Sequence, residues 1–134
     1  AMIDLDHFKE FNDRHGHDGG DAALTRIAEV LQATARESDV VCRYGGEELA
    51  VVMVGSDAAD AAAAAERMRR SIAHLSHPGN GQAAPALTAS FGVAAVPGDA
   101  TSVEDLIGAA DSALYVAKRA GRDRVERSSR SAGS

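Results

Sequence analysis

Hydrophobic positions along this chain follow two periods, which predict a mixture of strands and helices. Apolar residues dominate positions 1–5, and positions 87–95 alternate between larger apolar and smaller or polar side chains; both patterns indicate strands. Leu24, Ile27 and Leu31 recur at the spacing of one helix face. The complete expected order is a strand at 1–5, a short helix at 7–15, a longer helix that reaches position 35, strands at 40–43 and 48–54, a helix at 58–75, a strand at 87–95, a helix at 102–119 and an edge strand at 124–126.

Local residue choices mark the boundaries between these elements. Asp6 precedes the short helix and could cap it, and Gly16 with the Gly19–Gly20 pair should break the chain before the longer helix. Positions 77–85 hold two of the three prolines and are expected to form a loop, and 128–134 are expected to form a disordered tail. The order of elements predicts one domain at 1–127, an α/β sandwich whose central, mostly antiparallel five-stranded sheet is flanked by helices.

Composition narrows the classes of function. The 134 residues suffice for one core, and the net charge of −6 gives no basic surface for a nucleic-acid partner. Cys42 is the single cysteine, which excludes an intrachain disulfide and suits a reducing compartment. No apolar run is long enough to cross a bilayer, so we expect a cytoplasmic segment without membrane contact. His15 and His17 do not share a helix face, so no zinc site is expected.

Acidic residues stand at the ends of two expected strands. The Tyr-Gly-Gly-Glu run at 44–47 separates strands, and two glycines at a tight reversal are typical of a primed turn with positive φ. Asp4 could simply end its strand, and Glu47 could lie on a solvent-exposed hairpin tip. If the hairpin pairs beside the first strand, however, these two carboxylates and the Leu5 carbonyl converge. Such an oxygen site suits Mg²⁺ or Mn²⁺ and phosphoryl or nucleotidyl transfer.

Two places along the chain could bind phosphate. The helix that opens at 7–9 presents free backbone N–H groups directly after the acidic strand end, and Lys9 adds a positive charge. Lys118 and Arg122 flank the end of the last helix. The ordinary explanation for these two is that basic side chains neutralise a helix C-terminus.

Several short motifs occur in one fixed order. They are Asp-Leu-Asp-His-Phe-Lys at 4–9 with Asn12 and Asp13, Gly-His-Asp at 16–18 with Gly20 and Asp21, Arg-Tyr-Gly-Gly-Glu-Glu-Leu at 43–49, Ala-Ser-Phe-Gly-Val-Ala at 89–94, and Ala110, Asp111, Leu114, Tyr115, Ala117, Lys118, Gly121 and Arg122. Over positions 2–125 this ordered set resembles the GGDEF-domain diguanylate cyclases. The resemblance implies a fold like the palm of nucleotidyl cyclases and an enzyme that joins two GTP molecules into cyclic di-GMP, releasing pyrophosphate. Because each domain holds one GTP, it also implies a homodimer for catalysis.

The resemblance also implies roles for individual residues. Asp4, Glu47 and the Leu5 carbonyl would bind the metal, while Glu47 or Glu48 would assist the attacking ribose hydroxyl; whether Glu47 or water accepts its proton stays open. Asp21 would accept hydrogen bonds from the guanine edge that adenine lacks, which gives base selectivity. The substrate-binding residues implied in this way are Phe8, Lys9, Asn12, Asp21, Gly45, Gly46, Lys118 and Arg122.

Arg36 and Asp39 form an R-x-x-D pattern shortly before the hairpin. In isolation the pattern indicates a common surface ion pair. At this position the resemblance implies a product-inhibition site for cyclic di-GMP, with Arg67 as a second arginine from a neighbouring surface.

The chain departs from the family pattern in two respects. Leu49 stands where phenylalanine is usual, which we interpret as a packing adjustment, and the family's additional N-terminal helix has no counterpart here. We therefore expect a fragment of a longer chain, which could be inactive alone. Two alternatives to the cyclase are a catalytically silent module that senses GTP or cyclic di-GMP, and a nucleotidyl transferase like a polymerase palm or adenylyl cyclase. Asn12, Asp21 and the glycine hairpin together disfavour the second. The intact acidic residues favour an enzyme over the sensor.

Overall fold

The computed structural model describes residues 1–75 and 87–129. The expected loop at 77–85, and all but the first two residues of the expected tail at 128–134, lie outside the described residues. Ser128, the first residue of that expected tail, donates its backbone N–H to the carbonyl of Val93 over 2.7 Å. The chain is therefore still attached to the sheet at this position.

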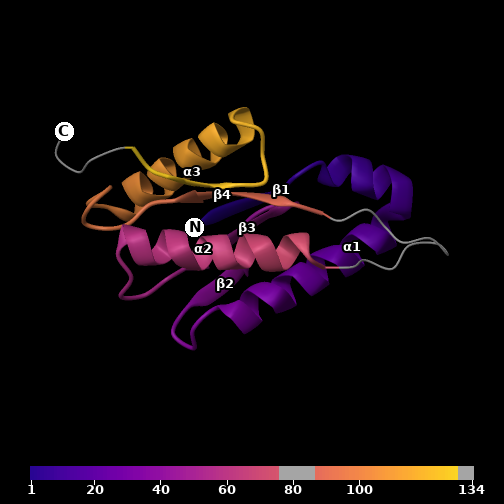
Figure 1. The fold of residues 1–134 in the computed structure, drawn as a ribbon, viewed down its shortest axis with the longest axis horizontal. Helices are drawn as coiled ribbons and strands as arrows, with labels where there is room; N and C mark the ends of the chain where they lie inside the picture. Colours follow the sequence, from indigo (N-terminus) through magenta and orange to yellow (C-terminus); the bar gives the residue numbers. More distant parts are fainter. Residues whose placement is uncertain (76–86, 130–134) are drawn as a thin grey trace.

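Five strands form one sheet in the order β2-β3-β1-β4-β5 (Figure 1). They are β1 (Met2–Leu5), β2 (Val40–Arg43), β3 (Glu48–Val52), β4 (Ala89–Val93) and β5 (Val125–Arg127). Neighbouring strands of this sheet are antiparallel, except β4 and β5, which run parallel. The predicted mostly antiparallel five-stranded sheet is confirmed, with boundaries that differ by one or two residues at several ends.

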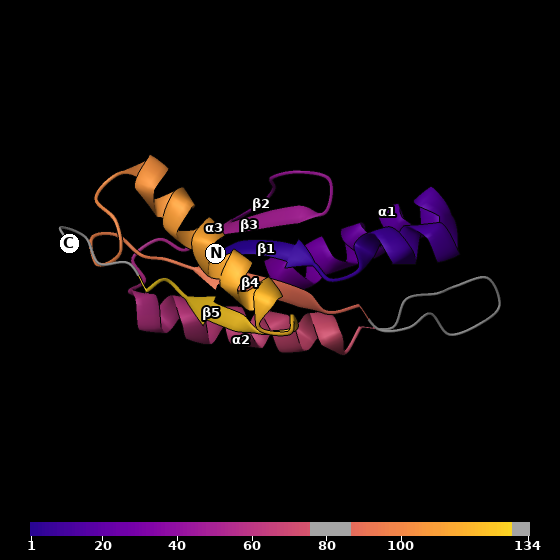
Figure 2. The same ribbon diagram turned by 90° about the horizontal axis from the view of Figure 1, so that it is seen from above.

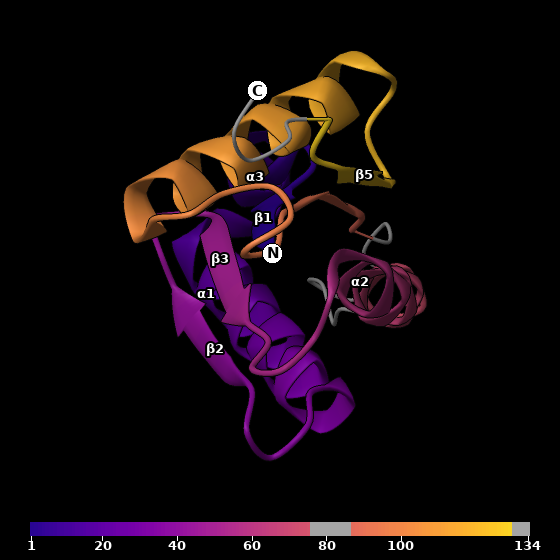
Figure 3. The same ribbon diagram turned by 90° about the vertical axis from the view of Figure 1, so that its left-hand side faces the viewer.

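Helices cover both faces of the sheet. They are α1 (Phe8–Thr34), α2 (Ala58–Ala73) and α3 (Val103–Arg119). Because successive strand residues point to opposite faces, Ile3 and Leu5 join the main core with α1 and α2, whereas Met2 joins a smaller cluster with Ala110 and Leu114 of α3. Figures 2 and 3 show α3 on one side of the strands and α2 on the other. None of the helices in residues 1–75 and 87–129 combines the length and the apolar character that a bilayer crossing requires.

The helix α1 consists of two helical segments joined by a kink at Gly16, which agrees with the short helix expected at 7–15 and the longer helix expected after it. Gly16 has φ 78° and ψ 169°, a combination that residues with a side chain rarely adopt. The helix continues through Gly19 and Gly20. A Cβ at Gly20 would overlap the side chain of Asn12, 1.6 Å from its Oδ1. The predicted break at Gly16 is thus present as a kink, but the predicted break at Gly19–Gly20 is wrong, since packing and not chain reversal requires the glycine at 20.

Asp6 does not cap α1, which corrects the cap expected from sequence. The residue at the cap position is His7, which has φ 55° and makes no capping hydrogen bond through its side chain. The buried carboxylate of Asp6 instead accepts hydrogen bonds from Thr88 Oγ1 and Ser90 Oγ, both at 2.7 Å. The cap is lost because β4, far away in sequence, places two hydroxyl donors beside this carboxylate.

Substituting Gly92 tests the contact between β4 and α3. A Cβ at this position would lie 2.1 Å from the carbonyl oxygen of Ala110 and 2.3 Å from the amide nitrogen of Leu114, both on the helix backbone. Gly92→Ala should therefore lower the free energy of unfolding by roughly 3 kcal/mol or more, measured by urea denaturation. Gly98→Ala is the matched control, because a Cβ there meets nothing within 4 Å, and it should change stability by less than about 0.5 kcal/mol. Equal effects of the two substitutions would contradict the close approach of α3.

Candidate functional site

The hairpin between β2 and β3 pairs beside the end of β1. Asp4 lies opposite Glu48 in the antiparallel register of β1 and β3. The backbone N–H of Leu5 donates to the carbonyl of Glu47 over 3.3 Å. Asp4, Glu47 and Glu48 therefore meet at one edge of the sheet, and the convergence of Asp4 with Glu47 is the one anticipated from their positions at strand ends.

Arg43 determines the shape of this hairpin. Its guanidinium donates to the carbonyl oxygens of Gly45 over 3.1 Å and Gly46 over 2.6 Å, while the N–H groups of Tyr44 and Gly45 donate to the carbonyl of Glu48. Neither glycine has a positive φ, so the predicted primed turn is wrong. The reversal spans the four residues 44–47 and is closed by a side chain, and this wider loop does not need left-handed residues.

Carboxylates are crowded at this edge. Burial raises the pKa of Glu47 above its usual value, the negative charge of Asp4 raises it further, and Lys118 partly opposes the shift. The ammonium group of Lys118 lies 2.9 Å from Asp4 Oδ1 and 3.4 Å from Asp6 Oδ1. Lys118 is therefore directed at the acidic strand end, and neutralising the end of α3 does not by itself explain its position.

The crowded carboxylates fit a hard divalent cation in their donor chemistry. Oxygen donors from two carboxylates and one carbonyl are what Mg²⁺ or Mn²⁺ prefers, and Mg²⁺ leaves several positions to water or phosphate. No cluster of three or more His, Cys, Asp or Glu side chains suited to a metal occurs in residues 1–75 and 87–129. A site at Asp4 and Glu47 would rely on the Leu5 carbonyl and on ligands from the substrate.

A polar cavity of about 440 Å³ opens beside the hairpin. One wall is formed by Gly46, Glu47 and Glu48, and the other by side chains of α1. The buried Oδ1 of Asn12 has no hydrogen-bond partner within the described part of the chain. An unpaired buried acceptor is costly in a folded protein, so a donor is expected to satisfy it. The lining residues are Phe8, Asn12, His17, Asp21, Leu24, Arg43, Gly46, Glu47 and Glu48.

The residues predicted to hold phosphate lie at two helix ends. Phe8 begins α1 and is buried, and Lys9 in the same turn is exposed. Arg122 is exposed just beyond α3, and its side chain has no hydrogen bond or ion pair with any residue that the structure describes. Among the residues that the structure describes, Lys118 is held at the acidic edge, whereas the side chains of Lys9 and Arg122 make no hydrogen bond or ion pair.

The R-x-x-D residues do not form the surface ion pair that is the ordinary explanation for their spacing. Asp39 accepts a hydrogen bond from the backbone N–H of Arg36 over 2.9 Å, and the guanidinium of Arg36 instead donates to Ser56 over 3.1 Å. The second carboxylate oxygen of Asp39 is buried without a partner in the described residues. Arg67 is exposed on α2. The structure gives no contact between Arg67 and the other two residues.

Sequence reasoning assigned no functional role to Arg43, His17 or Asp6. Arg43 was recognisable as the residue before the hairpin, and His17 as part of the Gly-His-Asp motif, although neither had an assigned partner. Asp6 had been interpreted only as a cap. Besides its hydroxyl donors, it accepts from the backbone N–H of Asp123 over 3.0 Å, a contact across 117 positions that local patterns do not reveal.

Comparisons with known proteins bear on this site. The family model described as "Diguanylate cyclase, GGDEF domain" matches residues 1–124. Diguanylate cyclase VdcA of Vibrio cholerae serotype O1 is 45% identical over 127 residues, which is 92% of this chain and 37% of VdcA. Diguanylate cyclase A of Treponema denticola is 40% identical over 124 residues, which is 92% of this chain and 33% of the relative. The chain thus spans about a third of the length of these curated relatives.

A solved structure shares the fold. The GGDEF domain of DgcB from Caulobacter crescentus, crystallised in complex with c-di-GMP, superposes with a TM-score of 0.87 at 35% identity. The match covers 94% of this chain and 74% of the DgcB chain. At this level of similarity the arrangement of strands and helices around the candidate site is the one found in that domain.

The raised pKa of Glu47 predicts that its charge costs stability. Below its usual pKa of 4.5 the side chain is neutral whether the protein is folded or unfolded, and as pH rises through the higher folded pKa its ionisation increasingly opposes folding. Glu47→Gln should therefore raise the melting temperature by roughly 1–3 °C at pH 7 and leave it unchanged near pH 4. Glu29→Gln, at an exposed position on α1, is the control. A Glu47→Gln variant that is no more stable than wild type at pH 7 would contradict the crowding.

Proposed function

The chain belongs to the GGDEF diguanylate cyclase domain family, and we propose that residues 1–127 condense two GTP molecules into cyclic di-GMP with release of pyrophosphate. The observation that carries this proposal is the convergence at one cavity of an acidic sheet edge and an unpaired amide oxygen. The acidic edge suits the reacting phosphate and hydroxyl. The unpaired oxygen of Asn12 suits a ligand rich in N–H donors, which guanine is.

The residues of α1 that line the cavity would select guanine. Asn12 Oδ1 can accept a hydrogen bond from the base, and the Asp21 carboxylate can accept from guanine N1–H and N2–H. Adenine lacks both donors on the corresponding edge, so binding it would leave these acceptors unpaired. A Cβ at position 20 would stand 1.6 Å from Asn12 Oδ1, so glycine at 20 leaves room for the amide in this orientation.

The acidic edge would carry the chemistry. A divalent cation bound there, Mg²⁺ or Mn²⁺, would neutralise phosphate charge and orient the α-phosphate for attack. Asp4, Glu47 and the Leu5 carbonyl would hold it. One carboxylate cannot easily bind a cation and accept a proton at once. If Glu47 binds the cation, the adjoining Glu48 is available to assist the ribose hydroxyl. Burial and the charge of Asp4 raise the pKa of Glu47, so a cation bound beside it would favour its ionised form.

Gly46 supports close approach of the substrate to the hairpin. It has neither a positive φ nor a protein atom within 4 Å of where a Cβ would stand. The fold therefore does not itself require glycine at 46. A side chain at this position would project beside the cavity, so we assign Gly46, with Gly45, to substrate binding.

Phosphate binding would involve both helix ends. The backbone N–H groups at Phe8 and Lys9 would contact the phosphates at the start of α1, where the helix dipole favours anions. Lys118 and Arg122 would bind the terminal phosphates from the end of α3.

Two copies of the domain would face each other during catalysis, since each supplies one GTP. Arg36 and Asp39, with Arg67 of a neighbouring surface, would bind cyclic di-GMP and inhibit the enzyme. The unpaired Asp39 oxygen is an acceptor suited to guanine N–H groups. Because its substrate GTP is a cytoplasmic nucleotide, we expect the reaction to take place in the cytoplasm.

The reaction itself gives the main test. Protein incubated with GTP and Mg²⁺ should produce cyclic di-GMP, detected by mass spectrometry, with a rate per protomer that rises with protein concentration because two domains must meet. Glu47→Gln should reduce the rate at least about 100-fold. A wild-type protein that binds GTP or cyclic di-GMP but forms no product at any concentration would refute the cyclase and identify a nucleotide sensor.

Substituting Arg36 tests the inhibitory site. Arg36→Ala should raise the cyclic di-GMP concentration needed for half-inhibition about tenfold or more, because a charge-assisted contact to phosphate is lost. Initial rates measured with added cyclic di-GMP provide the measurement, and Arg26→Ala, at an exposed position within α1, is the matched control. Unchanged inhibition of the Arg36 variant would show that the R-x-x-D match has no role in binding product.

A further inference from the structure

The turn between α3 and β5 has an unusual backbone. Gly121, Arg122 and Asp123 have φ values of 123°, 64° and 46°, so two residues with side chains follow each other in the left-handed region. This conformation is unfavourable for most L-residues, although Asp tolerates it better than Arg. It persists where surrounding contacts hold it, and such held backbone is frequent at ligand sites.

Three parts of the fold hold this turn. The backbone N–H of Asp123 donates to Asp6 Oδ2 of the β1 end over 3.0 Å. The Asp123 carboxylate accepts from Arg69 Nη1 of α2 over 2.6 Å. The backbone N–H of Arg122 donates to the carbonyl of Ala117 over 3.0 Å, which ties the turn to the end of α3. A fourth contact is local, since Arg124 Nε donates to the carbonyl of Arg122 over 3.2 Å. The two contacts that come from distant elements, the end of β1 and α2, both act on Asp123.

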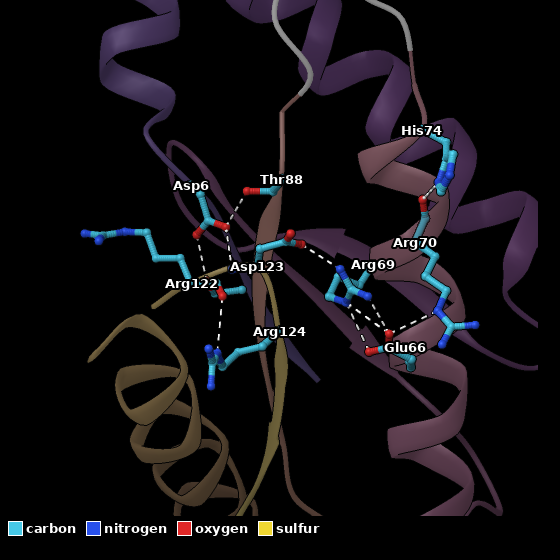
Figure 4. A network of polar contacts seen from close by, with 10 residues as sticks. Asp6, Glu66, Arg69, Arg70, His74, Thr88, Arg122, Asp123 and Arg124 are labelled. Carbon is cyan, nitrogen blue, oxygen red and sulfur yellow. Dashed lines mark hydrogen bonds and ion pairs between the residues drawn. The ribbon is translucent and has the colours of Figure 1, made fainter. Parts of the chain in front are cut away.

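Arg122 itself is directed away from these anchors. Figure 4 shows the carboxylate of Asp123 pointing toward Arg69, whereas the side chain of Arg122 extends to the opposite side of the turn. We propose that Asp123, held by Arg69 and Asp6, is a positioning residue that fixes the direction in which Arg122 projects. This inference rests on the proposed function, in which Arg122 binds the terminal phosphates of GTP.

The physical argument is that the backbone of Arg122 sets the side from which its guanidinium can reach a ligand. The guanidinium has no partner among residues 1–75 and 87–129, so side-chain contacts do not fix it. A return of Arg122 from φ 64° to a negative φ would redirect its Cα–Cβ bond. The contacts of Asp123 oppose that return. Losing them should weaken phosphate binding and spare the guanine contacts of the distant α1 wall.

The neighbouring Arg70 distinguishes this role from general stabilisation. Arg69 and Arg70 both pair with Glu66 on α2, but only Arg69 also reaches Asp123 (Figure 4). Replacing either arginine removes one positive charge from the same helix. An effect through the turn should follow from the Arg69 substitution and not from the Arg70 substitution.

The experiment compares two ligands that share guanine but differ in terminal phosphates. Calorimetric affinities of α,β-methylene GTP, which cannot undergo condensation, and of GMP are measured for wild type, Asp123→Gly, Asp123→Asn, Arg69→Met and Arg70→Met. Asp123→Gly keeps the left-handed backbone accessible and removes the carboxylate. Asp123→Asn retains an oxygen that can accept from Arg69 and tolerates positive φ. Thermal unfolding confirms that each variant is folded.

Asp123→Gly and Arg69→Met should each lower the affinity for the GTP analogue about fivefold to tenfold and change the affinity for GMP less than about twofold. Asp123→Asn and Arg70→Met should bind both ligands like wild type. In an Arg122→Ala background, Asp123→Gly should have no further effect, because the residue through which it acts is gone.

Three results would overturn the inference. They are an equal loss of affinity for both ligands, an undiminished effect of Asp123→Gly in the Arg122→Ala background, and an analogue affinity that Asp123→Gly leaves unchanged. In each of these cases wild type still binds the analogue, so the proposed function survives. A wild-type protein that binds neither ligand would overturn the proposed function and this inference with it.

Discussion

The carboxylate of Asp6 is buried where β1 ends, and the part of the candidate site at the end of α3 is organised around it. It accepts hydrogen bonds from Thr88 and Ser90 of β4, lies near the ammonium group of Lys118, and holds the backbone of Asp123. A buried charge without partners is very unfavourable, so these four groups are constrained to meet at one point. The last turn of α3 and the segment leading into β5 are fixed beside the acidic strand end as a result.

In contrast to Asp6, the carboxylates of the hairpin between β2 and β3 lie in an unfavourable position. Burial and the charge of Asp4 raise the pKa of Glu47, so the folded protein disfavours the ionised form of this side chain. Only Lys118 counters the effect within the described part of the site. Arg43 holds the hairpin carbonyl groups in place and so prevents the loop from moving its carboxylates apart. The arrangement is unfavourable for the isolated domain, and the proposed cation would relieve it by neutralising the carboxylates.

Periodicity was sufficient for most of the fold because long amphipathic segments have few alternative packings. The five strands, the covering helices and the mostly antiparallel sheet followed from it, and the motif order identified the family that the comparisons show. Local signals were less reliable where distant residues compete for the same group. Asp6 was expected to cap α1, yet Thr88 and Ser90 take its carboxylate. The glycines of the hairpin were expected in a primed turn, yet Arg43 closes a wider loop.

The sequence by itself determined which elements form, which residues are acidic or basic, and which family they resemble, since these follow from periodicity and from motifs that are local in the chain. Apart from Asp4 and Glu47, whose positions at strand ends anticipated their convergence, the tertiary structure decided which of those residues meet. Lys118 contacts Asp4 across 114 positions, and Arg69 contacts Asp123 across 54, because sheet order and helix packing bring their elements together. Such contacts have no sequence period. They form because the folded chain must pair its buried charged groups, and the partners lie on segments that are distant in sequence.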